Sequence, residues 1–422
     1  MNLAEAWRLA LDHDATIRGS RAAAEAGRER LPQARAQLFP QISASASRNR
    51  NDLESTAPDI TGRAATSEDK YTSSSNALTI RQPLFRPQLT AQVRQAQALA
   101  LNADKVLERD LQTLVTRVTE AYFQTLLAEE QLALIGVQKA AYTGQLDAAR
   151  KGFAAGAGTR TDIDEAQARL DLTVAQELEA RQNVDLARRQ LQVLINRPVD
   201  KVAAVDVKKL PLAGPGLNSI EEWTQRAEAA SPELQSLAAQ AEAARHQVDV
   251  AKAGHLPTLD AIGQISRSNS ENITRINSRY NQKQLGLQLQ VPIFQGGYVN
   301  SQVREALARE QLANETLEAG RRDLGVRVHK EFRGVTEGVL KVRALEQAVR
   351  SAEQLVTSSN RSFQAGARTR IDILNAEQQL GTARRDLAQA RFMYLISRVR
   401  LKALAGELMP ENIDEINGWL QN

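Results

Sequence analysis

The sequence of 422 residues contains no cysteine. That absence excludes disulfide bonds, thiolate metal sites and cysteine nucleophiles, and it also excludes the N-terminal cysteine on which a lipoprotein carries its lipid. Aromatic residues make up only 4% of the chain, which leaves few platforms for stacking single-stranded nucleic acid. Lysine and arginine number 54 against 50 aspartates and glutamates, and the two signs are interspersed. The net charge of +4 is therefore a weak argument for a nucleic-acid partner.

Long apolar runs are also missing. No stretch of eighteen apolar residues occurs, so we predict no transmembrane helix. The chain opens with "MNLAEAWRLALDHD", which lacks the apolar segment of a secretory signal peptide. If the protein is exported, we expect this sequence to be the form without its signal peptide.

Residues of familiar catalytic and metal sites are sparse. The histidines His13, His246, His255 and His329 are scattered singly, without the spacing or the acidic neighbours of a metal site. No GxxxxGK phosphate loop occurs, and "GAG" at 156–158 lacks the further glycine and the preceding strand of a dinucleotide site. No order of serine, histidine and aspartate stands out. The sequence therefore predicts no enzyme activity, no metal and no cofactor.

The chain is a tandem duplication. "FAAGAGTRTDID" at 153–164 returns 210 residues later as "FQAGARTRIDIL" at 363–374. At the same offset, "QVRQAQA" at 92–98 matches "QVREALA" at 302–308. A period of about two hundred residues is too long for a solenoid, so the repeat is a whole half of the protein. The proline- and glycine-punctuated stretch 196–216 reads as the linker between the halves.

Each half contains long stretches with a helical period. No proline falls between 88 and 197 or between 293 and 409, and a helix from about 89 to 152 would extend roughly 95 Å. Small and large apolar residues alternate at heptad spacing after both hinges. In the second half, a second and weaker line of apolar residues also has spacings that are multiples of seven: Leu374, Ala388 and Leu395. This second line predicts that one helix contacts neighbours on two sides.

Four segments follow a period of two instead, and they come in pairs. We predict strands at 41–49 and 76–82 in the first half and at 258–266 and 284–291 in the second. Each pair would enclose a long polar loop, at 51–70 and 267–279, and prolines lie near the entrances and exits.

Strands of this kind are typical of membrane barrels, although a soluble hairpin shows the same pattern. Four strands cannot close a membrane barrel, because the smallest have about eight. Lipid does not tolerate open sheet edges. If the hairpins face lipid, several chains must therefore share one barrel, which predicts an obligate oligomer.

The order of helix, strand, loop, strand, long helix, glycine-containing hinge and returning helix, present twice, resembles the TolC family of bacterial outer-membrane channels. The text that carries the resemblance best is "FQAGARTRIDILNAEQQLGTARRDLAQARFMYLISRVRLKALAGEL" at 363–408. The resemblance implies a mainly α fold with a small membrane β-barrel part, built by a homotrimer of tandem-duplicated protomers. Twelve strands would form one outer-membrane barrel, and twelve helices would form an α-barrel across the periplasm.

The resemblance also implies a function and partners. The protein would be a channel-tunnel in the outer membrane of a Gram-negative bacterium, surrounded by outer-membrane lipid. It would passively conduct substrates from an inner-membrane transporter and a periplasmic adaptor, in type I protein secretion or small-molecule efflux. The absent lipoprotein cysteine and the short tail look more like the type I secretion branch than the lipidated efflux branch.

The resemblance divides the chain into three kinds of region. The helical barrel is expected from 1–39, 88–256 and 297–406 with the linker 196–216, the barrel hairpins from 40–87 and 257–296, and a C-terminal tail at the equatorial region from 407–422.

The two hinges are expected at the periplasmic ends of helical hairpins. Gly156 and Gly366 suit the left-handed residue that ends a helix. Thr159 with Asp162, and Thr369 with Asp372, have the capping-box spacing that begins the next helix. Local helix-end chemistry alone is enough to explain these six residues.

The family resemblance implies a further role for residues at this end. Asp372 matches one acidic ring of the tunnel constriction, whereas Asn375 replaces the acid of the second ring, so one carboxylate ring is expected. Arg368 matches an arginine that ties the second hinge to the first, with Asp162 as its acceptor and Thr161 beside it. Phe363 occupies a place where a tyrosine can form a link, and that link is expected to be lost.

Two other classes of function stay open at this point. A soluble periplasmic coiled-coil adaptor or scaffold explains every heptad line but leaves the paired alternating segments without a purpose. A basic helical nucleic-acid binder needs a segregated positive face, which the sequence does not show. Enzymes rank below both.

Overall fold

The structure of the chain is a computed structural model that describes residues 1–58, 60–205, 212–216, 219–270, 277–407 and 417–418. The chain forms two compact units. Unit 1 consists of Met1–Ala23, Lys105–Gln235 and Glu318–Asn422, and unit 2 consists of Ala24–Asp104 and Ser236–Leu317. Each unit takes segments from both halves of the sequence.

Helices account for most of the chain, and the two halves match each other in length. The long helices are α4 (Pro87–Ala154, 68 residues), α5 (Arg160–Ile195, 36 residues), α8 (Tyr298–Gln364, 67 residues) and α9 (Arg370–Leu404, 35 residues). The shorter ones are α1 (Leu3–His13), α2 (Ala15–Arg28), α3 (Arg30–Ala36), α6 (Ile220–Ala230) and α7 (Pro232–Lys252), which continues into the 3₁₀ turn η1 (Ala253–His255). The matched lengths agree with the predicted duplication.

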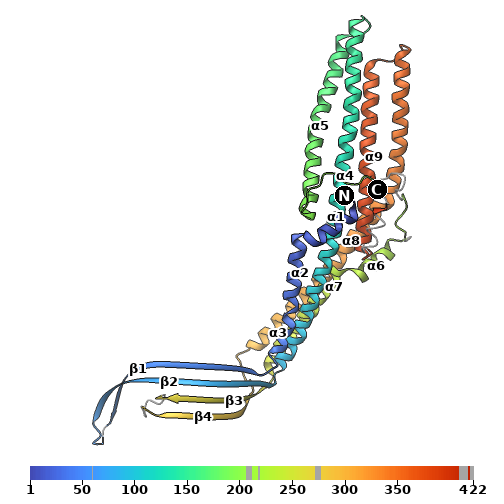
Figure 1. Cartoon of the computed structure of the whole chain (residues 1–422). Helices are drawn as coiled ribbons and strands as arrows, with labels where there is room; N and C mark the ends of the chain where they lie inside the picture. The colour runs from blue at the N-terminus through green and yellow to red at the C-terminus, as the bar shows by residue number, and fades with distance from the viewer. Residues whose placement is uncertain (59, 206–211, 217–218, 271–276, 408–416, 419–422) are drawn as a thin grey trace. The chain divides into compact units, whose positions relative to one another are not determined.

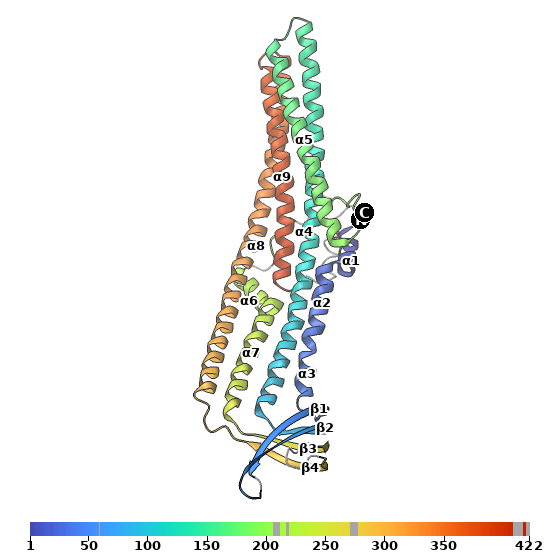
Figure 2. The same cartoon turned by 90° about the vertical axis from the view of Figure 1, so that its left-hand side faces the viewer.

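Unit 1 contains most of two antiparallel helical hairpins, one formed by α4 and α5 and the other by α8 and α9, which lie side by side (Figure 1, Figure 2). A 68-residue helix extends about 100 Å at 1.5 Å per residue. Such helices persist because no proline interrupts them and because their apolar lines are buried along the hairpins.

The apolar lines predicted from the sequence are buried. On α9 the heptad residues Ile373 and Ala376 are buried, and so are the residues of the second, weaker line, Leu374, Ala388 and Leu395. The prediction that this helix contacts neighbours on two sides is therefore confirmed. The line on α5 is interrupted by a glutamate, as described next.

Glu177 breaks the apolar line of α5 without leaving an unpaired charge. Lys139 of α4 donates to its carboxylate at 2.6 Å, and Arg181, one turn along α5, also donates at 2.6 Å. These two donors, Lys139 first, lower the pKa of Glu177 below its ordinary value. The ion pairs thus allow a carboxylate at a position where the pattern expects an apolar residue.

Helices α8 and α9 approach closely at two small residues. A Cβ added to Gly338 would lie 3.3 Å from the Tyr394 side chain, and one added to Gly334 would lie 2.8 Å from Cβ of Ser397. The two glycines are four residues apart and so share one face of α8. The second hairpin is therefore packed too tightly here for a larger side chain in α8.

The linker 196–216 is tied to both halves. The buried hydroxyl of Tyr122 on α4 donates to the Ala203 carbonyl at 3.0 Å, and burial raises the pKa of this tyrosine. Tyr394 on α9 donates to the Ala213 carbonyl at 2.9 Å. Residues 206–211 of the linker, and 408–416 and 419–422 of the expected tail, lie outside the described residues.

Unit 2 contains one antiparallel sheet with strand order β1-β2-β3-β4 (Figure 1). The strands are β1 (Gln41–Pro58), β2 (Ala64–Phe85), β3 (Thr258–Asn269) and β4 (Arg279–Gln290). The two hairpins, one from each half, join through β2 and β3. Within the described chain, β1 and β4 each pair on one side only, so the sheet has two open edges.

The prediction of a polar loop at 51–70 was wrong, because most of these residues form strands. The pairing of β1 with β2 continues without interruption from Gln41 opposite Arg81 to Pro58 opposite Ala64. Polar side chains support this extension across the strands, with Asn51 donating to Ser73 at 2.9 Å. No face of the extension is apolar, so an alternating hydrophobic pattern could not reveal it. For the second loop, 267–279, residues 271–276 lie outside the described residues.

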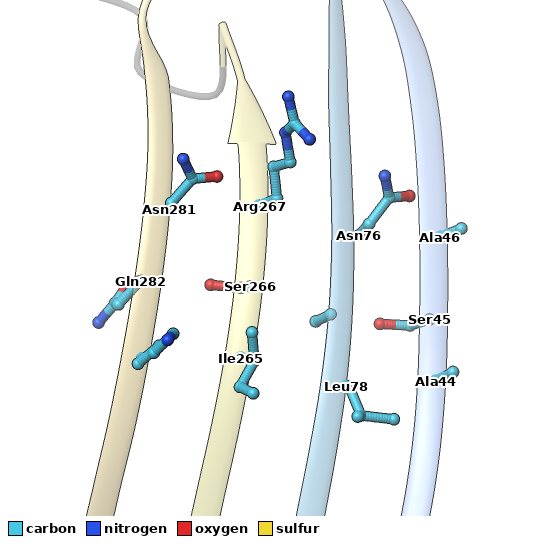
Figure 3. Close-up of a pocket in the computed structure, with 12 residues that line it drawn as sticks. Ala44, Ser45, Ala46, Asn76, Leu78, Ile265, Ser266, Arg267, Asn281 and Gln282 are labelled. Carbon is cyan, nitrogen blue, oxygen red and sulfur yellow. The ribbon is translucent and has the colours of Figure 1, made fainter.

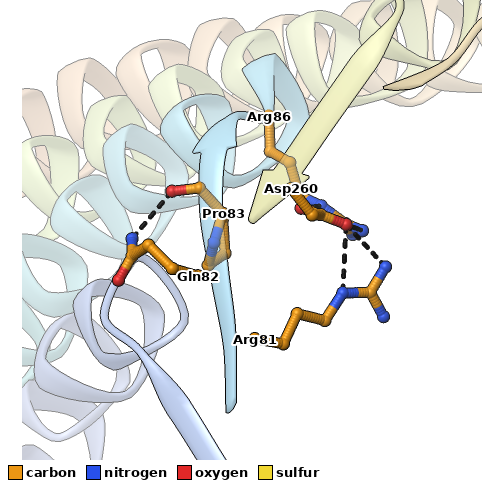
Figure 4. A network of polar contacts seen from close by, with 5 residues as sticks. All are labelled: Arg81, Gln82, Pro83, Arg86 and Asp260. Carbon is orange, nitrogen blue, oxygen red and sulfur yellow. Dashed lines mark hydrogen bonds and ion pairs between the residues drawn. The ribbon is translucent and has the colours of Figure 1, made fainter. Parts of the chain in front are cut away.

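One buried carboxylate connects the sheet to the start of α4. Asp260 of β3, whose side chain is 3% exposed, accepts hydrogen bonds from Arg81 at 3.0 and 2.6 Å (Figure 4). Arg86, between β2 and α4, donates to the same carboxylate through Nε at 2.7 Å and through Nη2. The two guanidinium groups thus hold the end of β2 against β3.

We predict that Asp260→Asn destabilises this end of the sheet. The two arginine side chains are 46% and 28% exposed, so no buried charge is left unpaired, and loss of the charged hydrogen bonds costs about 1.5–3 kcal/mol. Local amide hydrogen exchange in β2 and β3 should then accelerate by roughly 10- to 150-fold. The matched control is Asp52→Asn, whose carboxylate is 67% exposed and pairs with Lys70 at 3.3 Å. An exposed pair contributes about 1 kcal/mol or less, so exchange should change less than about tenfold. Equal effects of the two substitutions would contradict the assignment.

Candidate functional site

Both hairpin tips of unit 1 are built in the same way. A left-handed glycine lies just after the end of each long helix, Gly156 after α4 with φ of 72° and Gly366 after α8 with φ of 76°. After each glycine the chain folds back on the helix end, where the Ala157 amide donates to the Gly152 carbonyl at 2.9 Å. The equivalent bond in the second tip joins Ala367 to Ser362 at 2.8 Å. These bonds satisfy carbonyl groups that a helix end otherwise leaves unpaired.

A capping box begins the returning helix in each tip. The Asp162 carboxylate accepts from the amide and the hydroxyl of Thr159, both at 2.7 Å, while the Thr159 hydroxyl accepts from the Asp162 amide at 3.2 Å. Asp372 and Thr369 repeat the arrangement at 2.8, 2.8 and 3.4 Å. The reciprocal bonds between side chain and backbone fix the direction in which each helix returns.

The capping bonds stabilise the ionised form of the two aspartates. Hydrogen bonds from the backbone and then from the hydroxyl of Thr159 hold the pKa of Asp162 below its ordinary value. Those from Thr369 act in the same way on the pKa of Asp372. Both folded-state pKa values are depressed, so the caps contribute stability above the unfolded-state pKa and lose it as the pH falls through the folded-state pKa.

The structure does not bring the expected gate pair together within one chain. Arg368 donates through Nη1 to the buried hydroxyl of Ser359 at 2.8 Å, while Asp162 is occupied by its cap. Thr161, beside Asp162, is exposed. A contact between Arg368 and Asp162 therefore requires a neighbouring copy of the chain or a different conformation.

Arg370, which sequence reasoning missed, reaches the first hairpin instead. Its guanidinium carbon lies 4.9 Å from the centre of the Phe363 ring. Its Nη2 lies 3.6 Å from the place that a Cβ on Gly152 of α4 would occupy. Its positive charge also contributes to the lowered pKa of Asp162. The phenylalanine thus holds a cation by its ring face where the family resemblance suggested a tyrosine link.

The difference between the two halves explains this arrangement. In the first half, Arg160 occupies the position equivalent to Arg370 and pairs with Asp164 one turn along α5, at 3.4 Å. In the second half, the position equivalent to Asp164 is occupied by Leu374, which is buried. Because Arg370 has no such carboxylate on its own helix, its guanidinium turns to the phenylalanine ring.

The expected constriction residues lie one turn apart on α9. Asp372 is engaged by its capping box, and the amide oxygen of Asn375 accepts from Arg169 Nη2 of α5 at 3.1 Å. Arg169 also donates through Nη1 to the Gln378 side chain. Sequence reasoning missed Arg169, because nothing in the sequence connects two positions 206 residues apart. A cation therefore contacts Asn375, which replaces the acid of the family's second ring.

The sheet of unit 2 has two chemically different faces. In register, Ser45, Ala77, Ser266 and Gln282 form one cross-strand row, and Figure 3 shows Ser45, Ser266 and Gln282 pointing to one side. This row and the rows on either side of it, which belong to the opposite face, line a hollow of about 890 Å³. The same face carries the polar row Ser43, Thr79, Gln264 and Gln284.

The opposite face of the sheet is apolar and exposed. Figure 3 shows Ala44 and Leu78 pointing to the side away from the serines. The large apolar side chains that this face leaves exposed are Ile42, Leu78, Ile80, Ile265, Leu285, Leu287 and Leu289. A sheet with one polar face and one exposed apolar face has the arrangement of a membrane-barrel wall.

The described residues contain neither a metal-binding cluster nor a membrane-spanning helix. No group of three or more histidine, aspartate or glutamate side chains in the described part of the chain is arranged to hold a metal ion. None of the helices, as far as they are described, is apolar enough over a sufficient length to cross a membrane.

Comparison of the sequence with known proteins identifies a family. Residues 6–197 and 223–407 match the family described as "Outer membrane efflux protein". The alkaline protease secretion protein AprF of Pseudomonas aeruginosa is 34% identical over 410 residues, which cover 97% of this chain and 85% of AprF. The proteases secretion protein PrtF of Dickeya chrysanthemi is 30% identical over 424 residues, which cover 100% of this chain and 92% of PrtF.

Comparison of the fold agrees with the sequence matches. The crystal structure of the outer membrane protein VceC from Vibrio cholerae has a TM-score of 0.81 at 18% identity and covers 96% of this chain and 97% of that one. The names of these relatives describe secretion and outer membrane proteins, not enzymes. The predicted mainly α fold with a small sheet and the resemblance stated from the sequence are confirmed, whereas the trimer stays a prediction. The chain belongs to the outer membrane efflux protein family.

Proposed function

We propose that three copies of this chain form one channel that conducts substrates passively across the periplasm and the outer membrane. An inner-membrane transporter would supply the energy, and a periplasmic adaptor would dock in the grooves near the two hinges. AprF and PrtF are named as protease secretion proteins, so we favour type I secretion of protein over efflux of small molecules. The observation that carries the proposal is the open-edged sheet with one exposed apolar face.

The sheet supports a shared barrel. Unpaired backbone groups in hydrocarbon cost several kcal/mol each, so lipid excludes the open edges of β1 and β4. Joining β4 of one copy to β1 of the next satisfies both edges. Three copies then give twelve strands, which exceeds the minimum of about eight for a membrane barrel. The apolar face would meet lipid and the row of serines would face the lumen.

Exposed apolar side chains on the long helices support the same assembly. On α5, Leu172, Leu186 and Val193 are separated by multiples of seven residues and are each more than half exposed. On α8, Val326 and Leu340 are fourteen residues apart and equally exposed. Exposed apolar residues at this spacing form a helix surface that is suited to packing against another helix. In the assembly they would pack between copies of the chain.

The regions expected from the sequence fit this assembly. We assign 1–39, 88–256 and 297–406 to the periplasmic helical barrel, with the linker 196–216 between the halves, and 40–87 and 257–296 to the membrane barrel. The soluble coiled-coil adaptor is the weaker alternative, because it gives the exposed apolar face of the sheet no partner.

The constriction would carry charges of both signs. Three copies of Asp372 would form one carboxylate ring at the hairpin tips, as the family resemblance implies. Arg169 holds Asn375 one turn away, so a ring of three guanidinium groups would follow the ring of three carboxylates. We therefore expect weaker cation selectivity than two acidic rings would give.

One prediction tests the assembly itself. Extraction from membranes should require detergent, and the extracted particle should have three times the 46.4 kDa mass of one chain. Its circular dichroism should show sheet as well as helix, and it should conduct ions in a planar bilayer. A monomer that dissolves without detergent would contradict the proposal and favour the adaptor alternative.

The gate hypothesis concerns Arg368. We propose that it pairs with Asp162 of a neighbouring copy and helps to hold the tip shut. Three exposed pairs at about 0.2–1 kcal/mol each would bias the closed state by about 0.6–3 kcal/mol. Arg368→Ser should then raise the ratio of open to closed channels roughly 3- to 150-fold, measured as single-channel conductance and open time.

Two further variants make the gate test specific. Arg361→Ser removes an exposed charge from the last turn of α8, before the tip that contains Arg368, and should leave the conductance unchanged. Arg370→Ser removes the cation that lies over Phe363 and so tests whether a contact within one chain also holds the tip. Parent-like conductance of Arg368→Ser would remove Arg368 from the gate.

The constriction hypothesis predicts opposite effects of two substitutions. Asp372→Asn keeps an oxygen for the capping box but removes the charge, so the cation-to-anion permeability ratio should fall on the order of threefold. Arg169→Gln removes the opposing cation, so the ratio should rise by a similar factor. Asp164→Asn, which removes a carboxylate paired with Arg160 in the first tip, is the matched control and should have little effect. Reversal potentials in a salt gradient measure all three, and unchanged values for both test variants would refute the proposed rings.

A further inference from the structure

A cluster of three cations lies on the apolar face of the sheet, near the turn between β3 and β4. Arg267 of β3 pairs in register with Asn281 of β4, and Arg279 and Lys283 lie two residues to either side of Asn281. In an antiparallel pair such diagonal neighbours lie on the same face, about 7–8 Å apart. All three cations are exposed. These three residues are called the basic cluster.

The charges of the basic cluster are not compensated by the described chain. No carboxylate among the described residues forms an ion pair with any of the three, although Arg279 donates to the Asn269 side chain at 3.2 Å. Many helical arginines, in contrast, pair with an acid, as Arg188 does with Glu129 at 2.7 Å. Like charges close together on one sheet face destabilise it. The cluster therefore favours binding of an anion.

The surroundings of the cluster specify what kind of anion. On the same face, the next residues toward the helices are Ile265, which pairs with Lys283, and Leu285, which is 88% exposed. The apolar face continues to Leu289, six residues or about 20 Å from Lys283 along β4. The cations thus form the border of an apolar band, at the hairpin end of the sheet. A ligand that matches both the basic cluster and the apolar band has a negatively charged head group attached to an apolar body.

We propose that the basic cluster binds the phosphate groups of the glycolipid in the outer leaflet of the outer membrane. This inference rests on the proposed barrel, in which the helices extend into the periplasm and the hairpin ends therefore reach the outer leaflet. The acyl chains of the lipid pack along Leu285 and Ile265, and the phosphates lie at the level of Arg267 and Lys283.

The side chains present suit phosphate chemistry. The guanidinium groups of Arg267 and Arg279 offer paired N–H donors that match phosphate oxygens, and the Lys283 ammonium adds a point charge. The amide of Asn281 lies between the three cations and supplies a neutral donor. Arg48 of β1 lies in the same cross-strand row as Arg279, through Ser74 and Asn269, so the next copy around the barrel would extend the basic border.

The experiment measures lipid binding by the intact detergent-purified protein. Bisphosphorylated lipid A is titrated into the delipidated parent and into Arg267→Gln/Arg279→Gln/Lys283→Gln, and bound lipid is counted by native mass spectrometry. Each basic residue near an anionic lipid surface is worth roughly a factor of five, so the triple variant should bind on the order of 100-fold more weakly. The single variant Lys283→Gln should lose about fivefold and keeps the test decisive if the triple variant fails to fold.

Controls separate the charge cluster from general charge and from the acyl chains. Arg245→Gln/Arg309→Gln/Arg333→Gln removes three exposed helical cations that already pair with glutamates, and it should bind like the parent. Lipid A without its phosphates should bind the parent as weakly as bisphosphorylated lipid A binds the triple variant. Equal binding by the parent and Lys283→Gln, or equal binding of phosphorylated and dephosphorylated lipid, would overturn the proposal. Displacement of lipid by millimolar inorganic phosphate would show a free-phosphate site and also overturn it.

Mass and conductance are recorded on the same samples. A parent protein that is not a conducting trimer would defeat the proposed channel. A conducting trimer whose lipid binding ignores the three substitutions would defeat the basic cluster alone.

Discussion

The open edges of a four-stranded sheet are the constraint on which the proposed assembly depends. Backbone N–H and C=O groups along β1 and β4 have no partner within the described chain, and the apolar face of the same sheet is unsuited to water. In the proposed channel, lipid would cover the apolar face and neighbouring strands would pair with the edges. Because the described sheet of each copy has four strands, closure of the barrel would be a property of the assembly. The exposed apolar lines on the helices meet the same requirement, since they too lack partners in a single copy.

Duplication supplies most of the architecture, and the small departures from it supply the chemistry. The two halves produce helices of nearly equal length, and both tips use the same glycine and capping box. At the position one turn into the returning helix, however, one half has Asp164 and the other has Leu374. That single change turns Arg370 from a local ion pair toward the Phe363 ring and the neighbouring hairpin. Divergence between the halves thus creates contacts that a perfect repeat would lack.

Much of the fold could be predicted from the sequence, because its signals are local or periodic. The uninterrupted helices, the buried lines on α9 and the two tips each follow from residues within a few turns of one another. The strand extension through 51–70 could not be predicted, since polar residues on both faces leave no alternating pattern. Contacts between positions far apart in the sequence could not be predicted either. Arg169 meets Asn375, and Arg370 meets the end of α4, only because two long helices lie side by side. The expected pairing of Arg368 with Asp162 does not form within a single chain, where Arg368 donates to Ser359 and Asp162 is engaged by its own cap.

Each tip satisfies its own helix ends, with a glycine turn closing one helix and a threonine–aspartate box opening the next. A hairpin of this kind is mechanically self-sufficient, because it borrows no backbone hydrogen bond from its neighbour. In the proposed channel, the tips would therefore move apart as rigid helices, without unfolding a turn of either helix. The free energy that opposes such a movement would come from side-chain contacts between the hairpins.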